Sequence, residues 1–362
     1  MTNIRYDFID IAKGFGILSV VWAHILLVGW THKIIYAFHM PLFFFISGFL
    51  FNKSKYPSFH SFISKRFKRL IIPYLIYSFV TWGVWALFRY VRGDEVKSYI
   101  MPLLQTFIAQ GSGSHLVHNS VLWFIPCLLA VEIMYFHIQK FGIQIATIIC
   151  FSIAGLGIIM AHCWGKTYLD NMPWNLDAAF FALPFYCIGN ILRKYNLYSK
   201  IDKVLPVISK VLLLLILGII LLVFSLEFGE SSMGSSSYQC HELIFIFRAF
   251  IGIAALMMLA LLLSQIEMYG SKKILDGIRW CGIYSLEIMC IHIPIKGIII
   301  IIITKLLKTK VEVSTSFTYS FISFFITMCV VIFIICFIIK KLMIKNKQYY
   351  LKYEKCHHRQ TV

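Results

Sequence analysis

Long apolar segments alternate with short polar ones along almost the whole chain. Each apolar segment is about 20 residues long, which is the length that an α-helix needs to cross the hydrocarbon core of a bilayer. The segments lack the strict alternation of apolar and polar residues that is typical of the strands of a membrane barrel. The pattern therefore predicts ten transmembrane helices, at about residues 11–30, 34–52, 70–92, 119–139, 142–161, 174–193, 204–225, 242–264, 280–303 and 316–339.

The composition also indicates an integral membrane protein. Of the 362 residues, 59% are hydrophobic and 14% are charged, and the mean hydropathy is +0.79. Such a chain has too little polar side-chain surface to cover a soluble globule of this size. We expect an all-α, polytopic helical bundle, with one transmembrane domain at 1–340 and a basic cytoplasmic tail at 341–362. The first span is expected to be retained, because Asp7, Asp10 and Lys13 interrupt it and no small-residue cleavage site follows it.

The formal net charge of +18 indicates membrane topology rather than nucleic acid binding. Most lysines and arginines lie between the predicted spans and in the tail, and a cytoplasmic N-terminus would place most of them on the cytoplasmic side. The positive-inside rule therefore predicts that both termini are cytoplasmic. No nucleic acid partner is expected.

Two of the loops that are predicted to lie on the non-cytoplasmic side are longer than the others. The segment 93–118 contains IMPLLQTFIAQ, which we expect to form a short helix along the membrane interface, and it ends in GSGSHLVHNS, a flexible glycine- and serine-rich approach to the fourth span. The segment EFGESSMGSSSYQCHE is acidic and rich in serine. Neither loop is large enough to form a separate domain.

The first two predicted spans each carry a histidine well inside the bilayer. They are separated by a polar break at Thr31, His32 and Lys33, and a short hairpin would place His24 and His39 at similar depth. Ionisable groups are expensive inside a membrane and are usually functional there. The alternative is a neutral histidine pair that only holds the two helices together.

A line of polar residues follows one side of the first span. Lys13 and His24 are eleven residues apart, which on a helix is about 16 Å and a rotation of only about 20°. Asp10 is one turn before Lys13, so the two can form an ion pair. A phosphate-bearing carrier with a long arm, such as coenzyme A, would be held at Lys13 while its reactive group reached His24.

Arginines precede the third span. Arg66 and Arg69 are three residues apart, on one side of a helix, just before Pro73. Arginine binds phosphate through two parallel hydrogen bonds, so these residues are candidates for cofactor binding. The alternative is that they, like the lysines of the same loop, set the topology or bind anionic lipid headgroups.

The ninth span repeats the pattern of polar groups at helical spacing. Ser285, His292 and Lys296 fall on one side of the predicted helix. Glu287 points away from them, and we expect it to pair with another buried group such as Arg248 in the eighth span.

Metal and nucleophile chemistry are less well supported by the sequence. The three intramembrane histidines do not show the i, i+4 spacing that is typical of zinc sites on helices, so no metal is expected. Ser47 lies in FFFISGF rather than in a G-x-S-x-G motif and is interpreted as a small helix-packing residue. The ten cysteines include no C-x-x-C pair, and most fall inside apolar spans, where we expect them to act as small hydrophobic residues.

Several motifs along nearly the whole chain resemble the acyltransferase 3 family of integral-membrane acyltransferases. They are D-x-x-K-G followed by a histidine eleven residues after the lysine, FHMPLFFFISGFLF, KRFKRLIIPY, LWFIPCLL and YSLEIMCIHIPI. The resemblance implies a ten-span enzyme that transfers acetyl, or occasionally another short acyl group, from cytoplasmic acyl-CoA to a hydroxyl of an envelope or exported glycan. By position, His24 resembles the essential family histidine, Lys13 the basic residue of the first motif, and Arg69 the arginine before the third span.

Two features depart from the family pattern. Lys13 stands where arginine is frequent, and lysine keeps the charge but lacks the planar fork of arginine. We expect no hydrolase-type domain after the predicted membrane domain, because only a basic tail follows it in the sequence. We therefore expect the membrane domain itself, or a separate partner, to hand over the acyl group outside.

The sequence thus predicts a membrane O-acetyltransferase that uses acetyl-CoA as its acyl donor. His24 is expected to act as a general base on the acceptor hydroxyl, or to carry the acyl group itself, with Asp10, His39 and His292 as further catalytic candidates. Lys13, Arg66 and Arg69 are the expected cofactor-binding residues. The expected partners are a glycan or lipid-linked sugar and the membrane lipids, the expected location is the bacterial cytoplasmic membrane, and no particular oligomeric state is indicated.

Two other classes of protein fit the same residues. A proton-coupled transporter or a lipid-linked glycan flippase would use buried histidine and aspartate as a proton relay and would not depend on acyl-CoA. A structural partner in the cell envelope would tolerate substitution of the histidines.

Overall fold

The computed structural model describes residues 6–111, 115–164, 172–235, 237–265, 269–307 and 313–345. Ten helical segments in these ranges are long and apolar enough to cross a membrane, so the predicted all-α fold with ten spans is confirmed. They are α1 (Asp7–Ile25), α2 (Trp30–Leu50), α3 with α4 (Phe59–Arg66 and Ile72–Arg92), α6 (Phe124–Ile138), α7 (Ile143–Trp164), α9 (Leu176–Lys194), α11 (Val207–Glu227), α12 (Glu242–Gln265), α14 (Ser285–Leu307) and α15 (Phe317–Lys345).

Shorter elements connect these helices. The short α-helices are α5 (Met101–Ile108), α10 (Leu197–Val204) and α13 (Tyr269–Ile283), and the 3₁₀ turns are η1 (Lys53–Lys55), η3 (Ser120–Trp123), η4 (Gln139–Phe141), η5 (Pro173–Asn175) and η6 (Val313–Thr315). Within the described residues the only strands are β1 (Ser231–Ser232) and β2 (Ser237–Tyr238), which form one antiparallel hairpin. The helix predicted in IMPLLQTFIAQ is confirmed as α5, whereas residues 112–114 of the predicted flexible approach lie outside the described residues.

The first hairpin turns earlier than predicted. The break lies at Leu26–Gly29, and the polar residues Thr31, His32 and Lys33 belong to the first turn of α2. Gly29 has φ +94°, a conformation that glycine adopts at little cost. The polar break was predicted in the wrong place because His32 is buried and pairs with Glu230 instead of facing solvent.

The third span is longer than predicted and contains a π-turn. Residues 67–71 form one turn of π-helix (η2, Phe67–Ile71) that joins α3 to α4. Pro73 lies in the first turn of α4 and has no backbone N–H, so the hydrogen bond that it would give to the carbonyl of Arg69 in a regular α-helix is missing. The helix continues through this widened turn.

The ninth and tenth spans also differ from their predicted bounds. The polar residues around 272–284 form the separate helix α13, so the ninth span begins at Ser285 and not at 280. Helix α15 continues to Lys345, beyond the predicted end at 339 and the predicted domain boundary at 340. The rest of the predicted basic tail, residues 346–362, lies outside the described residues.

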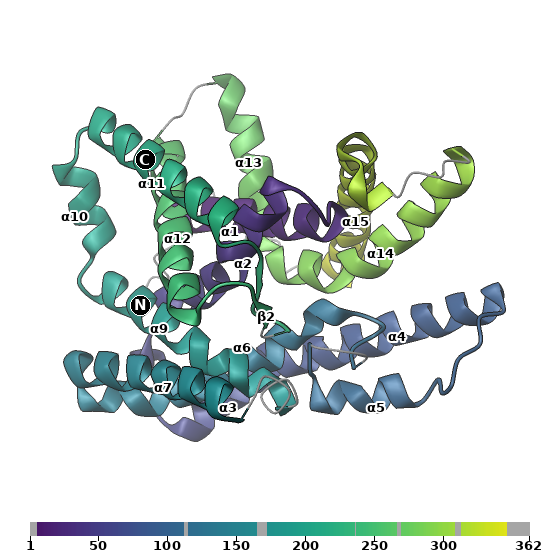
Figure 1. The fold of residues 1–362 in the computed structure, drawn as a ribbon, viewed down its shortest axis with the longest axis horizontal. Coiled ribbons are helices and arrows are strands. Elements are labelled where there is room, and N and C mark those ends of the chain that lie inside the picture. Colours follow the sequence, from purple (N-terminus) through teal and green to yellow (C-terminus); the bar gives the residue numbers. More distant parts are fainter. Residues whose placement is uncertain are drawn as a thin grey trace.

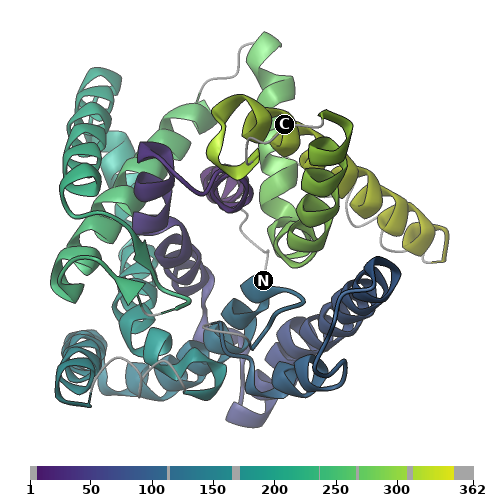
Figure 2. The ribbon, with the colours of Figure 1, turned by 45° about the vertical axis from the view of Figure 1, so that its right-hand side comes forward.

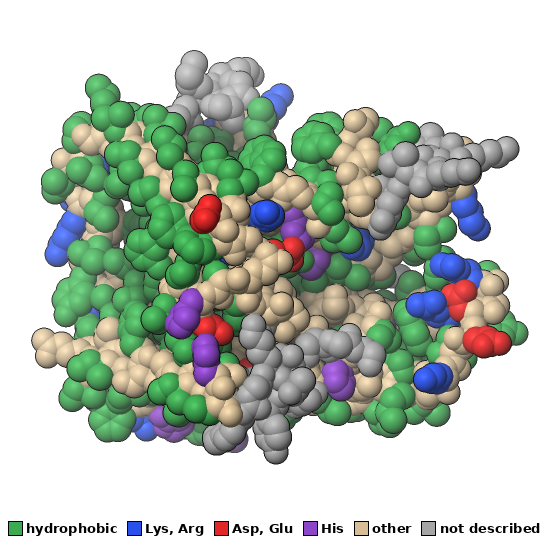
Figure 3. Space-filling model, viewed as in Figure 1, with side chains coloured by type: hydrophobic (Ala, Val, Ile, Leu, Met, Phe, Trp, Pro, Cys, Tyr) green, Lys and Arg blue, Asp and Glu red, His purple; other side chains and the backbone are tan. Residues whose placement is uncertain are grey.

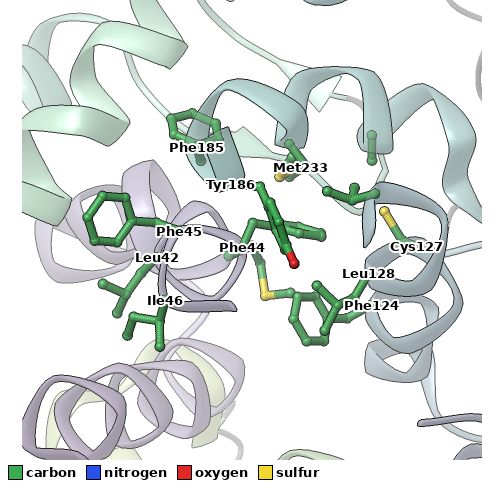
Figure 4. Packing of buried hydrophobic residues seen from close by; sticks show 14 of the residues in the cluster. Leu42, Phe44, Phe45, Ile46, Phe124, Cys127, Leu128, Phe185, Tyr186 and Met233 are labelled. Atoms are coloured by element: carbon green, nitrogen blue, oxygen red, sulfur yellow. The ribbon is translucent and has the colours of Figure 1, made fainter. Parts of the chain in front are cut away.

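Helices α1 and α2 lie inside a ring formed by the other helices (Figures 1 and 2). Helix α2 packs most closely on α9, where Gly48 and Gly189 let the two backbones approach each other. A Cβ atom added to Gly48 would lie 1.9 Å from the carbonyl oxygen of Tyr186. The Tyr186 side chain projects between the helix that carries Phe44 and the helix that carries Phe124 (Figure 4).

The outer helices present apolar side chains to their surroundings. Helix α11 is the least buried span, and its exposed residues are apolar, Ile208, Ile216 and Ile219 among them. Hydrophobic side chains dominate the face drawn in Figure 3, where charged side chains are few. This surface suits lipid rather than water.

The loops sort onto two faces of the bundle. On one face, Leu27 N–H donates to the Ser314 carbonyl (3.0 Å), so the loop after the first span meets the loop before the tenth. On the same face, Asn175 joins Gly111 and Gly234, from the loops after the third and seventh spans. We call this side the lid face. The loops after even-numbered spans lie on the opposite face, as ten consecutive crossings require.

Candidate active site

A cavity of about 230 Å³ lies between α1, α2, α14 and the loops of the lid face. Its lining consists of Val20, His24, Tyr36, His39, Met40, Gly111, Ser120, Val121, Trp123, Ser232, Met233, Gly234, Ser235 and Met289. Two of the predicted catalytic histidines, His24 and His39, are therefore in its wall.

His24 lies one residue before the end of α1 and is half-buried. Its ring centroid is 5.4 Å from that of His292, on α14. His39 lines the same cavity, as the prediction of similar depth requires, but Tyr36 lies between the two histidines, with ring centroids 6.2 Å from His24 and 4.8 Å from His39. The predicted polar pair is thus a group of four rings, in which His24 faces His292 rather than His39.

His292 is fully buried, and one of its ring nitrogens is hydrogen-bonded to the backbone. Its Nδ1 lies 2.9 Å from the carbonyl oxygen of Met289 and 3.1 Å from that of Ile288. Carbonyl oxygens only accept hydrogen bonds, so Nδ1 carries the proton and Nε2 is left as an acceptor in the neutral ring. Nε2 has no hydrogen-bond partner among the described residues. A buried acceptor without a partner is costly, and it is placed to receive a proton or a substrate hydroxyl.

His39 shows the same arrangement. Its Nδ1 donates to the carbonyl of Ile35, one turn earlier in α2, at 2.8 Å. The opposite ring nitrogen is then an acceptor as well. Two histidines of this group thus have their tautomers fixed by the backbone of their own helices.

Lys296 fixes the end of α1. It lies one turn after His292, on the side of α14 that the sequence predicts for both residues, and its Nζ donates to the carbonyl oxygen of His24 at 2.5 Å. The last carbonyls of a helix have no partner in the helix itself, and a lysine is a favourable one. The bond couples the position of His24 to α14.

A contact between a histidine and a carboxylate, which the sequence did not predict, lies beside the cavity. His32 Nδ1 is 3.3 Å from a carboxylate oxygen of Glu230, and the His32 ring stacks at 4.1 Å on Tyr36. The hydrogen bond from His32 holds the pKa of Glu230 below its ordinary value. His32, which the sequence predicts to lie in a turn, therefore connects α2 to the acidic loop that contains Glu230.

The loops of the lid face cover the cavity. Asn175 accepts a hydrogen bond from the Gly111 N–H (2.7 Å) and donates one to the Gly234 carbonyl (2.8 Å). Gly234 in turn lies against Trp123, where an added Cβ atom would be 2.5 Å from the indole nitrogen. We call Gly111, Asn175 and the β1–β2 hairpin the lid.

Arg248 holds the base of the lid and does not pair with Glu287, so that prediction was wrong. Its guanidinium donates to the Gly229 carbonyl (2.7 Å) and to the Ser231 hydroxyl (2.6 Å). Glu287 instead lies where the charges of Lys13 and Arg69 act on it. The expected pairing failed because the loop before α12 folds back onto that helix and supplies the oxygen atoms that Arg248 needs.

The other end of the polar line on α1 lies away from the lid. Lys13 Nζ is 4.0 Å from the Asp10 carboxylate, as the spacing predicts. Because α1 is a continuous helix from Asp7 to Ile25, the eleven residues from Lys13 to His24 extend about 16 Å along its axis. Lys13, Glu287 and Arg69 bring together α1, α14 and η2 at this end.

The two arginines before the third span have different surroundings. Arg66 Nε lies 3.0 Å from the buried carboxylate of Glu132, and only 11% of the Arg66 side chain is exposed. Arg69 is exposed, with its charge acting on Glu132 as well as on Glu287. Arg66 therefore completes a buried ion pair, whereas Arg69 is accessible to a ligand.

The sequence of the chain matches a known protein family. A family model described as an acyltransferase domain matches residues 6–341, nearly the whole chain. No curated protein and no solved structure matches it.

Proposed function

The chain belongs to the acyltransferase 3 family and is a multi-pass membrane acyltransferase, and from this premise we propose that it transfers an acetyl or other short acyl group from acyl-CoA to a hydroxyl of a glycan. The observation that supports this proposal best is the pair His24 and His292. They come from different helices and have ring centroids 5.4 Å apart. His24 lines the cavity, and the same helix α1 carries Lys13 at its other end. We further propose that both termini are cytoplasmic and that the protein lies in the cytoplasmic membrane, which places the lid outside.

The donor is proposed to bind at the Lys13 end of α1. Lys13 and the exposed Arg69 supply positive charge for the phosphates of acetyl-CoA, and the charges of both act on Glu287. Arg66 supports this site from inside, through its ion pair with Glu132. The long arm of the carrier then extends about 16 Å along α1 to His24.

The proposed reaction is a direct transfer. The acceptor oxygen forms a bond to the thioester carbonyl carbon while His24 takes the hydroxyl proton as a general base. The carbon–sulfur bond then breaks, and the leaving thiolate receives that proton, so the products are the ester and free coenzyme A. We assign to His292, whose Nε2 has no partner among the described residues, and to His39 the role of orienting the acceptor or sharing the proton.

A covalent variant uses the same residues. His24 attacks the thioester, releases coenzyme A as its thiol, and holds the acyl group as an acyl-imidazole until the acceptor hydroxyl takes it. The variant explains how an acyl group from one side of the membrane reaches an acceptor on the other. It predicts acyl label on the protein when no acceptor is present, which the direct transfer does not.

The cavity volume of about 230 Å³ restricts what the site holds. Sites for drug-sized ligands usually measure about 300–1,000 Å³. The cavity therefore fits the reacting acyl group and one end of the acceptor, and the rest of a glycan would lie outside the lid.

Transfer of label from radioactive acetyl-CoA in membranes that contain the protein tests the proposal. His24→Ala should lower transfer at least about 100-fold, since a positioned acid–base group contributes about 10²–10⁴-fold. His60→Ala, which removes an exposed histidine of α3, should leave transfer unchanged at equal protein level. Retained transfer in His24→Ala would remove His24 from the mechanism, and proton-coupled solute uptake without any acyl transfer would favour the transporter instead.

A further inference from the structure

A second group of ligating side chains lies on the lid face, away from the cavity lining. His162 is near the end of α7, His241 directly precedes α12, and Glu242 is in the first turn of α12. One ligating atom from each residue lies within 4.8 Å of the other two. The two imidazole rings are 5.7 Å apart between centroids and tilted by 32°.

The hydrogen bonds of His162 prepare it as a ligand. Its Nδ1 donates to the carbonyl oxygen of Ile158, one turn earlier, at 2.9 Å. Nε2 is then left with a free lone pair, which is the usual state of a metal-binding histidine, whose other nitrogen donates to a carbonyl or carboxylate. His162 is exposed, so its Nε2 is accessible to a metal ion.

Glu242 supplies a carboxylate that is buried. Its side chain is 6% exposed, and its carboxylate lies 3.9 Å from His241 Nδ1. Buried carboxylates are normally paired or bind a metal ion. Two imidazoles and one carboxylate are also the donor set that Zn²⁺ accepts readily.

We propose that His162, His241 and Glu242 bind a divalent transition-metal ion, best matched by Zn²⁺, with water in the fourth position. Bonds of about 2.0–2.2 Å in a tetrahedral site place donor atoms about 3.3 Å apart. The donor atoms, which now lie within 4.8 Å of one another, therefore have to move closer together, and both histidine side chains are exposed. His241 gives up the hydrogen bond that its Nδ1 accepts from Leu243 N–H (3.2 Å).

The ion would act as a clamp for the lid. It joins the end of α7, which leads to Asn175, to the start of α12, which follows the β1–β2 hairpin. The segment that contains Asn175 and the β1–β2 hairpin, which already contact each other through the Asn175 amide, would then be connected a second time, through the metal ion. The binding site itself does not depend on the proposed acyltransferase function.

Zn²⁺ binding to the purified full-length protein, with any histidine tag removed, tests the proposal. Equilibrium dialysis against Zn²⁺, with metal measured by mass spectrometry, should give one tight site per chain. His162→Ala and His241→Ala should each weaken it at least 10-fold, and Glu242→Gln should do the same. His60→Ala should leave it unchanged.

A spectroscopic measurement adds a check on geometry. Co²⁺ in place of Zn²⁺ should give the intense visible bands of a four-coordinate site in the wild type and in His60→Ala, and these bands should be lost in His162→Ala. His162 is exposed, so its substitution is not expected to affect folding, which size-exclusion chromatography would verify. Affinities of His162→Ala and His241→Ala within twofold of the wild type would overturn the proposal, whatever Glu242→Gln does.

Discussion

His292 is a fully buried residue with one ring nitrogen that lacks a hydrogen-bond partner among the described residues. Its Nδ1 is bonded to the backbone and its Nε2 faces no partner among the described residues. Asparagine at this position keeps a donor near the place of Nδ1 but has no atom near Nε2. We expect His292→Asn to lower the kcat of acyl transfer roughly 100-fold and to leave the KM for acetyl-CoA nearly unchanged, since the donor is proposed to bind at the other end of α1. A normal kcat would show that Nε2 has no part in the reaction.

Lys13 should act on donor affinity rather than on the rate of chemistry. Lys13→Gln removes a cation near Glu287 and should raise the KM for acetyl-CoA about tenfold, the loss of roughly 1.4 kcal/mol for a charge-assisted hydrogen bond. Lys13→Arg should keep the KM within about twofold, because charge and reach are retained. Initial-rate kinetics in membranes measures both constants. A fall in kcat at constant KM in Lys13→Gln would contradict the assignment.

His118 should make the stability of the protein depend on pH. It is 3% exposed, and neither ring nitrogen has a partner among the described residues. Burial lowers the pKa of His118 to about 4, against 6.5 in an unfolded chain. Between these values the unfolded state binds the proton more strongly, so up to roughly 3 kcal/mol of stability is lost as the pH falls from 6.5 to 4, and none above it.

His118→Leu tests this dependence. The variant should lose less of its melting temperature between pH 7.5 and pH 5 than the wild type, because it has no imidazole to protonate. Tryptophan fluorescence of the detergent-solubilised protein follows the unfolding. The other histidines titrate equally in both proteins, so an identical pH dependence would show that His118 is not responsible.

At the scale of single residues, the sequence predicts spacing along a helix but not partners on other helices. The Asp10–Lys13 pair and the common side of His292 and Lys296 follow from helical periodicity and are confirmed. The partners of His32 and Arg248 lie in the loop between the seventh and eighth spans, and no periodicity relates that loop to α2 or α12.

Among the elements, the spans were predictable and the irregular pieces were not. A span is recognised by length and apolarity, which are properties of one segment. The π-turn depends on how the chain compensates for Pro73, and α13 is too polar to resemble a span. The β1–β2 hairpin is rich in serine, and its Gly234 contacts Asn175 and Trp123, so strand propensity in the sequence does not predict its shape.

The crossing of α2 and α9 should be the most sensitive contact between helices. A Cβ atom on Gly189 would lie 2.1 Å from the carbonyl oxygen of Phe45, so Gly189→Ala must push two backbones apart. We expect it to lower stability by about 1–3 kcal/mol, the usual range for overpacking. Gly155→Ala, in α7, has nothing within 4 Å of the added atom and should be neutral or slightly stabilising. Thermal unfolding of both variants tests this prediction. Equal melting temperatures for Gly189→Ala and Gly155→Ala would contradict the close crossing of α2 and α9.

The whole molecule has two faces, and two cysteines report on them. Cys163 is exposed near the end of α7, on the lid face, whereas Cys356 belongs to the predicted cytoplasmic tail. A membrane-impermeant maleimide applied to intact cells should label Cys163, and it should label Cys356 only after permeabilisation. Cys163→Ser and Cys356→Ser identify the two signals. Labelling of Cys356 in intact cells, and of Cys163 only after permeabilisation, would show that the topology is the opposite of the one proposed and that the lid lies in the cytoplasm.

At this scale the sequence predicted the class and the number of spans but not their arrangement. The order of helices around α1 is set by contacts such as Asn119 Nδ2 to the Cys290 carbonyl, which joins residues far apart in the chain. Such contacts leave no periodic trace in a single sequence. The cavity is lined by α1, α2, α14 and two loops. The sequence therefore predicted only one part of it, the similar depth of His24 and His39.

The side-chain amide of Asn175 has a kinetic consequence. Because it holds Gly111 and Gly234 at once, an opening of the cavity between these two parts of the lid would have to break both hydrogen bonds. Turnover that waits for such an opening is independent of the length of the acyl chain and slows as solvent viscosity rises. One asparagine would then set the pace of acyl transfer, separately from the chemistry that is proposed for His24.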